Sequence, residues 1–202
     1  MDVLSGYASA ELNIKNSRFL AEAIPVTSQA EARTVLKAQK EKYADATHVV
    51  HAFAVGNNAE ILGMSDDGEP AGTAGRPMLD VLKGKKCTNI LLTVTRWFGG
   101  TLLGTGGLVK AYGDSAKAVL EAAQFHQLTS RRFFSFNVSY DLYEVAKRFL
   151  HSIDALDIEE KFEVAILFEG HIPSGNAEKL SDYITELTKG SETVDLSEEL
   201  YM

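Results

Sequence analysis

The chain has little cysteine and no long apolar run, and each shortage excludes a class of protein. Its single cysteine, Cys87, allows no internal disulfide, which is typical of proteins in a reducing, intracellular compartment. No apolar run approaches the ~20 residues that a membrane-spanning helix needs. Residues 1–6 show no secretory signal pattern. We therefore expect a soluble, cytoplasmic protein with no membrane partner.

Motifs for nucleotides, metals and covalent catalysis are also missing. Neither the phosphate loop G-x-x-x-x-G-K-[ST] nor the dinucleotide pattern G-x-G-x-x-G occurs. His48 and His51 are three residues apart on an expected strand, so their side chains point to opposite faces and do not readily share a metal. Cys87 has no recognisable histidine partner for nucleophilic catalysis. We expect no metal and no cofactor, and we assign no catalytic residue.

What the chain does have is a glycine-rich stretch from Ser65 to Tyr112, which holds nine of its sixteen glycines. Eight of the nine lie in two loops, Gly68–Gly75 and Gly99–Gly107. Glycine weakens helices and strands, but it serves where backbone must turn with positive φ or approach another group closely. Exposed backbone amides beside basic side chains are what an anion-binding surface needs. The alternative is that both loops only connect elements of the fold.

Charge is distributed unevenly along the chain. Residues 1–132 carry fifteen basic and thirteen acidic side chains, whereas residues 133–202 carry five and fifteen. The segment from Arg76 to Lys110 has six basic residues and one acid, Asp80. Such a local excess predicts an anionic partner, with RNA as the leading candidate. A solvated basic face without a partner is the alternative.

Two features within the glycine-rich stretch each permit two interpretations. The amides of Thr105–Leu108 begin an expected helix, where an oxyanion or phosphate could bind near Arg96 and Lys110, or where loop backbone could simply pack. Asp66, Asp67 and Glu69 could supply oxygen ligands, but an acidic loop facing a basic one favours ion pairs with Arg76 or Arg96. Such pairs would hold the two loops together as one cleft.

Hydrophobic periodicity indicates two domains of mixed helix and strand. In residues 1–130 it predicts strands at 7–14, 18–26, 48–56, 59–64 and 89–95, and helices at 28–43, 78–82 and 104–123. The polar segment 124–132 marks the boundary. In residues 133–202 it predicts strands at 133–140, 162–168 and 192–196, and helices at 143–153 and after Pro173. This order suggests a ferredoxin-like α+β sandwich in the second domain.

Two long motifs, SDDGEPAGTAGRP and TRWFGG followed by LGTGGLVKAYG, resemble the YigZ/Impact family, uncharacterised protein family 0029. The resemblance is strong over the first ~130 residues. Trp97, Leu102 and Lys110 stand where Tyr, Lys and Arg are commoner in that family. The change at Leu102 removes one positive charge from the second loop.

The resemblance implies an α+β fold, with an N-terminal α/β sandwich like the second domain of ribosomal protein S5 and a C-terminal ferredoxin-like sandwich. It also implies a translation-associated regulator that binds RNA, the ribosome or a protein partner through a glycine-rich basic cleft. An enzyme acting on a phosphorylated small molecule at that cleft is the alternative. The residues expected to bind the ligand are His48, Asp66, Asp67, Glu69, Gly72, Thr73, Arg76, Thr95, Arg96, Gly99, Gly100, Gly104, Gly106, Gly107 and Lys110.

Overall fold

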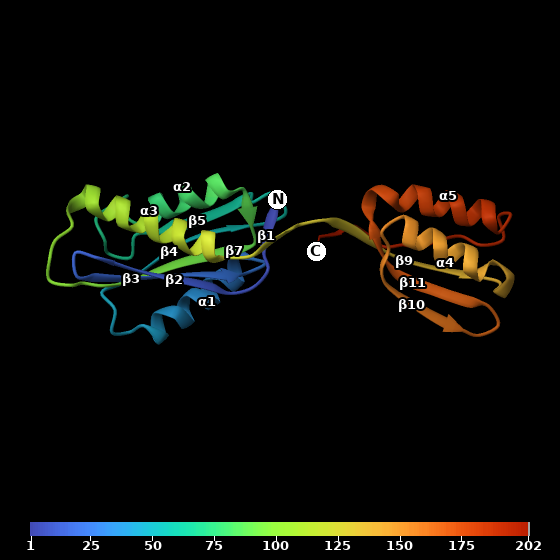
Figure 1. Cartoon of the computed structure of the whole chain (residues 1–202), viewed down its shortest axis with the longest axis horizontal. Helices are drawn as coiled ribbons and strands as arrows, with labels where there is room; N and C mark the ends of the chain where they lie inside the picture. Colours follow the sequence, from blue (N-terminus) through green and yellow to red (C-terminus); the bar gives the residue numbers. More distant parts are fainter. Residues whose placement is uncertain (202) are drawn as a thin grey trace. The chain divides into compact units, whose positions relative to one another are not determined.

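The computed structural model describes residues 1–201 of the chain (Figure 1). It divides into two compact units, Met1–Leu128 and Thr129–Met202. Both units combine helices with sheets, so the expected α+β class is confirmed. None of the helices in the described residues is long and apolar enough to cross a membrane. That residues 1–130 and 133–202 fold as separate domains stays a prediction, which limited proteolysis across residues 124–132 would test.

The N-terminal unit is built on a five-stranded antiparallel sheet with the order β2-β3-β7-β4-β5. Its central strand β7 is buried at every position from Ile90 to Arg96, as its near-continuous apolar run predicts. The five strands are β2 (Ala8–Ile14), β3 (Ser17–Pro25), β4 (His48–Val55), β5 (Ile61–Ser65) and β7 (Ile90–Trp97).

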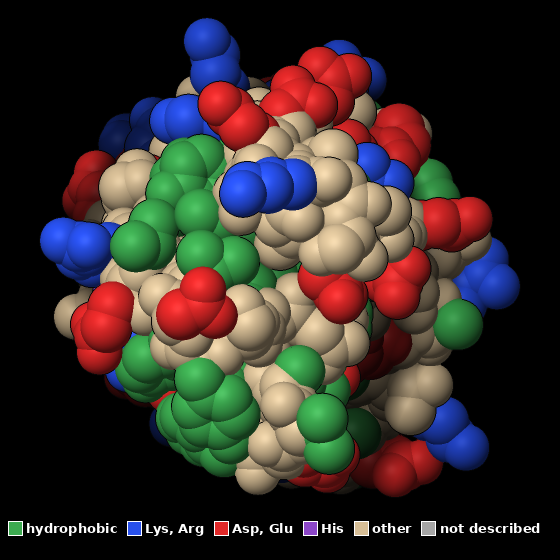
Figure 2. Space-filling model, turned by 90° about the vertical axis from the view of Figure 1, so that its right-hand side faces the viewer, with side chains coloured by type: hydrophobic (Ala, Val, Ile, Leu, Met, Phe, Trp, Pro, Cys, Tyr) green, Lys and Arg blue, Asp and Glu red, His purple; other side chains and the backbone are tan. Residues whose placement is uncertain are grey.

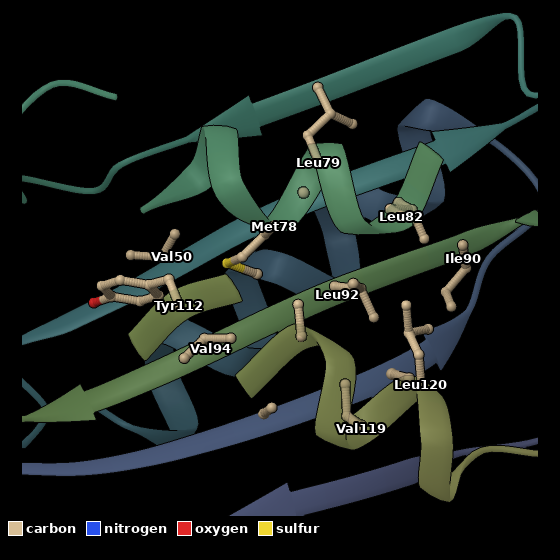
Figure 3. Packing of buried hydrophobic residues seen from close by; sticks show 14 of the residues in the cluster. Val50, Met78, Leu79, Leu82, Ile90, Leu92, Val94, Tyr112, Val119 and Leu120 are labelled. Atoms are coloured by element: carbon tan, nitrogen blue, oxygen red, sulfur yellow. The ribbon is translucent and has the colours of Figure 1, made fainter. Parts of the chain in front are cut away.

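Three helices cover this sheet: α1 (Gln29–Lys42), α2 (Gly75–Lys85) and α3 (Gly104–Ala122). Helices α2 and α3 lie on one face and α1 on the other (Figure 1). Because strand side chains alternate between faces, Leu92 and Val94 of β7 pack in the main core under α2 and α3. Leu91 packs in a smaller cluster with Ala32 of α1. Figure 3 shows the main core, in which Tyr112 of α3 lies beside Val50 and Val94.

Helix α1 begins with the expected capping residue, since the Ser28 hydroxyl accepts the Glu31 amide at 3.2 Å. Helix α2 differs from the prediction of Met78–Leu82. It starts at Gly75, before Pro77, because the Asp66 carboxylate accepts the amides of Ala74 and Gly75. It continues through Gly84 to Lys85 and ends at Lys86, whose φ of 56° is left-handed.

The segment 124–132, where the sequence predicts the domain boundary, contains secondary structure. Phe125–Gln127 forms strand β8 and pairs with β1 (Asp2–Leu4), which also pairs with β6 (Cys87–Thr88). Strand β9 (Ser130–Val138) then begins the C-terminal unit. Strands of two or three residues are too short to produce a periodic pattern, so the sequence did not reveal this three-stranded sheet.

The C-terminal unit has the order β9-α4-β10-β11-α5-β12 and the strand order β10-β11-β9-β12. That antiparallel arrangement is ferredoxin-like, as expected. Helices α4 and α5 lie on the same side of its sheet (Figure 1). Its other elements are α4 (Tyr143–Ser152), β10 (Leu156–Phe162), β11 (Ile166–Pro173), α5 (Ala177–Leu187), β12 (Asp195–Leu196), β13 (Leu200–Tyr201) and the short 3-10 helices η1 (Tyr140–Leu142) and η2 (Ser174–Asn176).

The expected strand 162–168 has the wrong bounds, because it joins the last residue of β10, a turn with a fully exposed Val164 and the start of β11, and β10 itself was not predicted. The reason is a charge on the inner face of β10. Glu160 pairs with Lys147 at 2.9 Å and accepts the Tyr143 hydroxyl at 2.7 Å. Because Glu160 is charged, β10 lacks the alternation of apolar and polar residues that would have indicated a strand.

On the face of the molecule in Figure 2, hydrophobic side chains lie in patches among acidic and basic ones.

Candidate functional site

A buried ion pair connects the first glycine loop to the central strand. Arg96 donates from a terminal nitrogen to Glu69 Oε1 at 2.6 Å, and both side chains are almost completely buried. This contact confirms the prediction that the acidic loop pairs with Arg96. Arg96 lies on the same face of β7 as Leu92 and Val94, so it faces α2 and α3 at the edge of the main core.

Tyr112 completes the surroundings of Glu69 from helix α3. Its hydroxyl donates to Glu69 Oε1 at 2.8 Å. Burial raises the pKa of Tyr112, and the hydrogen bond to the Glu69 carboxylate raises it further. Figure 3 shows the Tyr112 hydroxyl pointing away from the labelled apolar side chains. The Glu69 charge is thus compensated from two elements, which fixes the first loop against the sheet and α3.

His48 lies next to this pair on strand β4, where it is the register partner of Arg96. Its Nδ1 lies 2.7 Å from the carbonyl oxygen of Asp67. Because a carbonyl only accepts, Nδ1 carries a proton in this contact. The other ring nitrogen, Nε2, lies 3.9 Å from Glu69 Oε2. His51 belongs to the opposite face of the strand, as its spacing predicts.

The first loop is closed by its own carboxylates. Asp66 accepts the amides of Gly72 at 2.8 Å, Ala74 at 3.0 Å and Gly75 at 2.8 Å. Burial opposes ionisation of Asp66, but these three hydrogen bonds outweigh it and lower its pKa. Asp67 accepts from the Val49 amide at 2.7 Å and also pairs with Lys40. The carboxylates of Asp66, Asp67 and Glu69 therefore take separate protein partners instead of converging as metal ligands.

A cavity of about 400 Å³ opens between the two glycine loops. The prediction that they face each other across one cleft is therefore confirmed, and we call this cavity the loop cleft. The polar side chains of His48, Glu69 and Arg96 form what we call its floor. Its walls are largely apolar, with exposed Phe98 and Leu102 at the second loop. It is lined by Thr47, His48, Glu69, Pro70, Arg96, Phe98, Leu102, Leu103, Gly104, Thr105 and Leu108.

The start of helix α3 forms one side of the loop cleft. Leu103 occupies the N-cap position, and no side chain caps the helix there. The first amides of a helix have no partner within it, so those of Gly104, Thr105 and Gly106 are free to bind an acceptor. Gly104 needs its glycine because its φ is +73°, whereas a Cβ at Gly106 would meet no atom within 4 Å. The helix start is therefore open.

Several expected ligand residues lie elsewhere. Thr95 faces the α1 side of the sheet, because it alternates with Arg96, and its buried hydroxyl has no hydrogen-bond partner among the described residues. Arg76 pairs with Asp80 on the surface of α2 at 3.0 Å. Lys110 pairs with Asp114 on α3 at 2.6 Å. None of these three lines the loop cleft.

The remaining glycines and Thr73 have roles within the fold. Gly99 approaches the turn between β2 and β3 so closely that a Cβ would lie 2.0 Å from the backbone of Asn16. Gly72 and Gly100 have positive φ, of 76° and 81°. A Cβ at Gly107 would lie 3.0 Å from Leu103, and the Thr73 hydroxyl donates to the Pro70 carbonyl. These residues shape the loops without lining the loop cleft.

Sequence reasoning missed Tyr112 and the apolar walls. Tyr112 lies on the buried, periodic face of α3, where its spacing alone predicts a core residue. A buried tyrosine needs a partner for its hydroxyl, and this requirement was the available signal. Trp97, which stands where Tyr is commoner in the family, has its indole donating to Asp45 at 2.8 Å and its ring covered by Arg18. Phe98, the next residue, is 45% exposed.

Comparison with known proteins identifies relatives over nearly the whole chain. Residues 15–120 match the Impact N-terminal domain. The chain is 32% identical to the IMPACT family member YvyE of Bacillus subtilis, covering 95% of this chain and 88% of that protein. It is also 32% identical to the IMPACT family member YigZ of Escherichia coli, with 88% of each covered. A crystal structure of a hypothetical protein superposes with a TM-score of 0.65 at 29% identity, covering 96% and 95% of the two chains.

Proposed function

Because the chain belongs to the IMPACT family, we propose that it is a cytoplasmic, translation-associated regulator that acts by binding a partner through the loop cleft. The translational role comes from the family resemblance, which implies regulators that work through a protein partner. The site supports binding rather than chemistry. Its charged groups are engaged with one another, and its walls are shaped to receive a ligand.

One observation supports this proposal above all: the charges at the floor of the loop cleft neutralise each other, and its walls are apolar. Arg96 is compensated by Glu69, and neither Arg76 nor Lys110 lines the loop cleft. Exposed Phe98 and Leu102 instead offer the kind of anchors that protein interfaces use at their centres. A protein partner therefore fits the loop cleft better than RNA does.

RNA or the ribosomal RNA surface remains a second candidate, because a different surface supports it. Lys83, Lys86 and Lys117 have no ion-pair partner among the described residues, and they lie on or just after α2 and on α3. Binding there would weaken with salt, because phosphates would release counterions. It would not depend on Phe98 or Leu102.

The enzymatic alternative depends on His48, which lines the loop cleft and whose Nε2 lies 3.9 Å from Glu69 Oε2. A phosphorylated substrate would need basic groups to compensate its charge. The one arginine in the loop cleft is already paired, so the site favours this alternative least.

Co-sedimentation with purified ribosomes, at low and moderate salt, tests the proposal. The wild-type chain is compared with the double variant Phe98→Ser/Leu102→Ser, which changes two exposed side chains and should leave the fold intact. Loss of ribosome association in this variant supports the loop cleft as the binding surface. The triple variant Lys83→Gln/Lys86→Gln/Lys117→Gln is the control, and selective loss in that variant would favour RNA instead. If all three proteins associate equally, or none does, the proposal is wrong.

A further inference from the structure

We propose that the loop cleft recognises the free C-terminal carboxylate of a partner protein whose last residue is apolar. This inference rests on the proposed function, since it names the chemistry of the partner's contact. Two parts of the loop cleft carry it. One can bind a single negative charge, and the other can bury an apolar group.

The first part is the helix start of α3. Its free amides and the positive end of the helix dipole attract a carboxylate. The two glycine loops make a useful contrast here. At α2 the equivalent amides hold the Asp66 carboxylate at 2.8–3.0 Å, whereas no side chain reaches those of α3. The protein therefore contains one helix start occupied by a carboxylate and a second that is ready for one.

Arg96 at the floor of the loop cleft provides the second, independent observation. Arg96 lines the loop cleft and is 5% exposed, yet its Nε has no hydrogen-bond partner among the described residues. A buried guanidinium nitrogen without an acceptor is costly, so this position indicates an acceptor that arrives with a ligand. The Nε atom is closed to solvent in this structure, so a ligand carboxylate at the floor would supply the acceptor through a shift of the Arg96 side chain.

Charge balance decides which anion fits. Arg96 is already neutralised by Glu69, whose other oxygen faces His48. The floor is therefore close to neutral overall, and only the partial charge of the helix start remains. That charge suits one carboxylate and does not compensate a phosphate dianion or a polyanion. Backbone capture of a C-terminal carboxylate is an established mode of peptide recognition.

The walls specify the rest of the ligand. Pro70, Phe98, Leu103 and Leu108 surround the same cavity, whose volume of about 400 Å³ is that of a small-ligand site. An apolar side chain next to the carboxylate would bury its surface against these walls. Leucine and phenylalanine are the simplest terminal residues with that property.

Calorimetric titration of the full chain with two synthetic peptides tests the inference. Both are N-acetylated octapeptides that end in leucine and have no charged side chain, one with a free carboxylate and one amidated. We expect the acid to bind at least about tenfold more tightly than the amide, the effect of a charge-assisted interaction. Equal affinity for the two peptides, or no binding of the acid at millimolar concentration, would overturn the inference.

Matched variants at Gly106 give a second readout. The position is exposed with open space around it, and glutamate and glutamine are both better helix formers than glycine. Gly106→Glu places a competing carboxylate at the helix start and should weaken acid binding about tenfold, whereas Gly106→Gln should stay within about threefold. Equal binding by the two variants contradicts the proposed position.

The outcomes separate this inference from the proposed function. If the acid peptide fails to bind while Phe98→Ser/Leu102→Ser still loses ribosome association, the loop cleft is the interface but its ligand is not a carboxylate. If a mixed-sequence RNA 20-mer binds and Gly106→Glu weakens it as much as the peptide, the ligand is a polyanion and the inference is wrong.

Discussion

The two glycine loops have similar composition but different roles. Both precede a helix on the same face of the sheet, and both line the loop cleft. The first satisfies its own helix start through Asp66 and attaches to the sheet through Asp67 and Glu69. The second has no acidic residue, so the start of α3 stays open. Glycine richness alone therefore does not identify a binding loop, and what decides is whether the chain supplies its own acceptor.

The largest expected effect comes from breaking the attachment of the first loop. Glu69→Ala leaves Arg96 buried without its partner and Tyr112 without its acceptor. We expect a loss of about 3–5 kcal/mol in the free energy of unfolding, the cost of a broken buried pair. Urea denaturation measures it, and Tyr112→Phe, which removes one hydrogen bond, should cost only about 1–2 kcal/mol. A loss below that of Tyr112→Phe would mean that the pair does not hold the loop.

The Asp66 cap should contribute less, because the residue is only partly buried. Asp66→Ala removes the acceptor of three amides, and we expect a loss of about 1–3 kcal/mol. The pKa of Asp66 is lower in the folded state than its ordinary 3.8. Its ionised form therefore stabilises the fold above that pH, and this stabilisation is lost as pH falls through the folded pKa.

Urea denaturation of the wild type and Asp66→Asn between pH 7 and pH 3 measures this dependence. The asparagine cannot ionise, so the difference between the two proteins should shrink at the acidic end. A difference that is constant across this range would show that the charge of Asp66 has no role in closing the loop.

The sequence predicted those parts of the fold that depend on long periodic segments. The buried strand β7, the helix α3 and the capping residue Ser28 follow from local patterns. Strand β10 was missed because Glu160 faces inward with Lys147, and the α2 start was misplaced because its cap, Asp66, lies nine residues before Gly75. In both cases the deciding contact is between residues distant in sequence.

The candidate site was predicted in part for the same reason. Opposed charges in the two motifs indicated the Glu69–Arg96 pair, but they could not indicate which other basic residues would find partners first. Arg76 and Lys110 each have an aspartate four residues later on their own helix, and those pairs form instead. The apolar walls were not predicted, because Leu103 and Leu108 belong to the cavity only once the loop has folded back.

Two glycines of the second loop, Gly104 and Gly106, should respond to alanine in opposite ways. One is needed for its positive φ, and the other lies in open space at the helix start. Gly104 has a φ of +73°, so Gly104→Ala should lose about 1 kcal/mol. Gly106 lies within the helix and has open space, so Gly106→Ala should gain up to about 1 kcal/mol. Thermal unfolding of both variants measures these opposite shifts. Destabilisation by Gly106→Ala would reveal a packing role for that glycine and weaken the case for an open helix start.

The smallest expected effect comes from Lys110, one of the basic residues that the sequence predicts as a ligand for an anion. The Lys110 side chain is 77% exposed and pairs with Asp114 on its own helix. Lys110→Ala should therefore change the unfolding free energy by no more than about 0.5 kcal/mol, as expected for such helix pairs. Because Lys110 does not line the loop cleft, affinity for a partner there should not change.

A phosphate contact by Lys110 would instead reduce the slope of RNA affinity against salt concentration by about one when the residue is replaced. Titrating wild type and Lys110→Ala with RNA at several salt concentrations distinguishes these outcomes, with Lys117→Ala as a matched change of an unpaired lysine on the same helix. A smaller slope for Lys110→Ala alone would place the anionic partner at the start of α3 after all, and the difference between the two loops would then be one of charge.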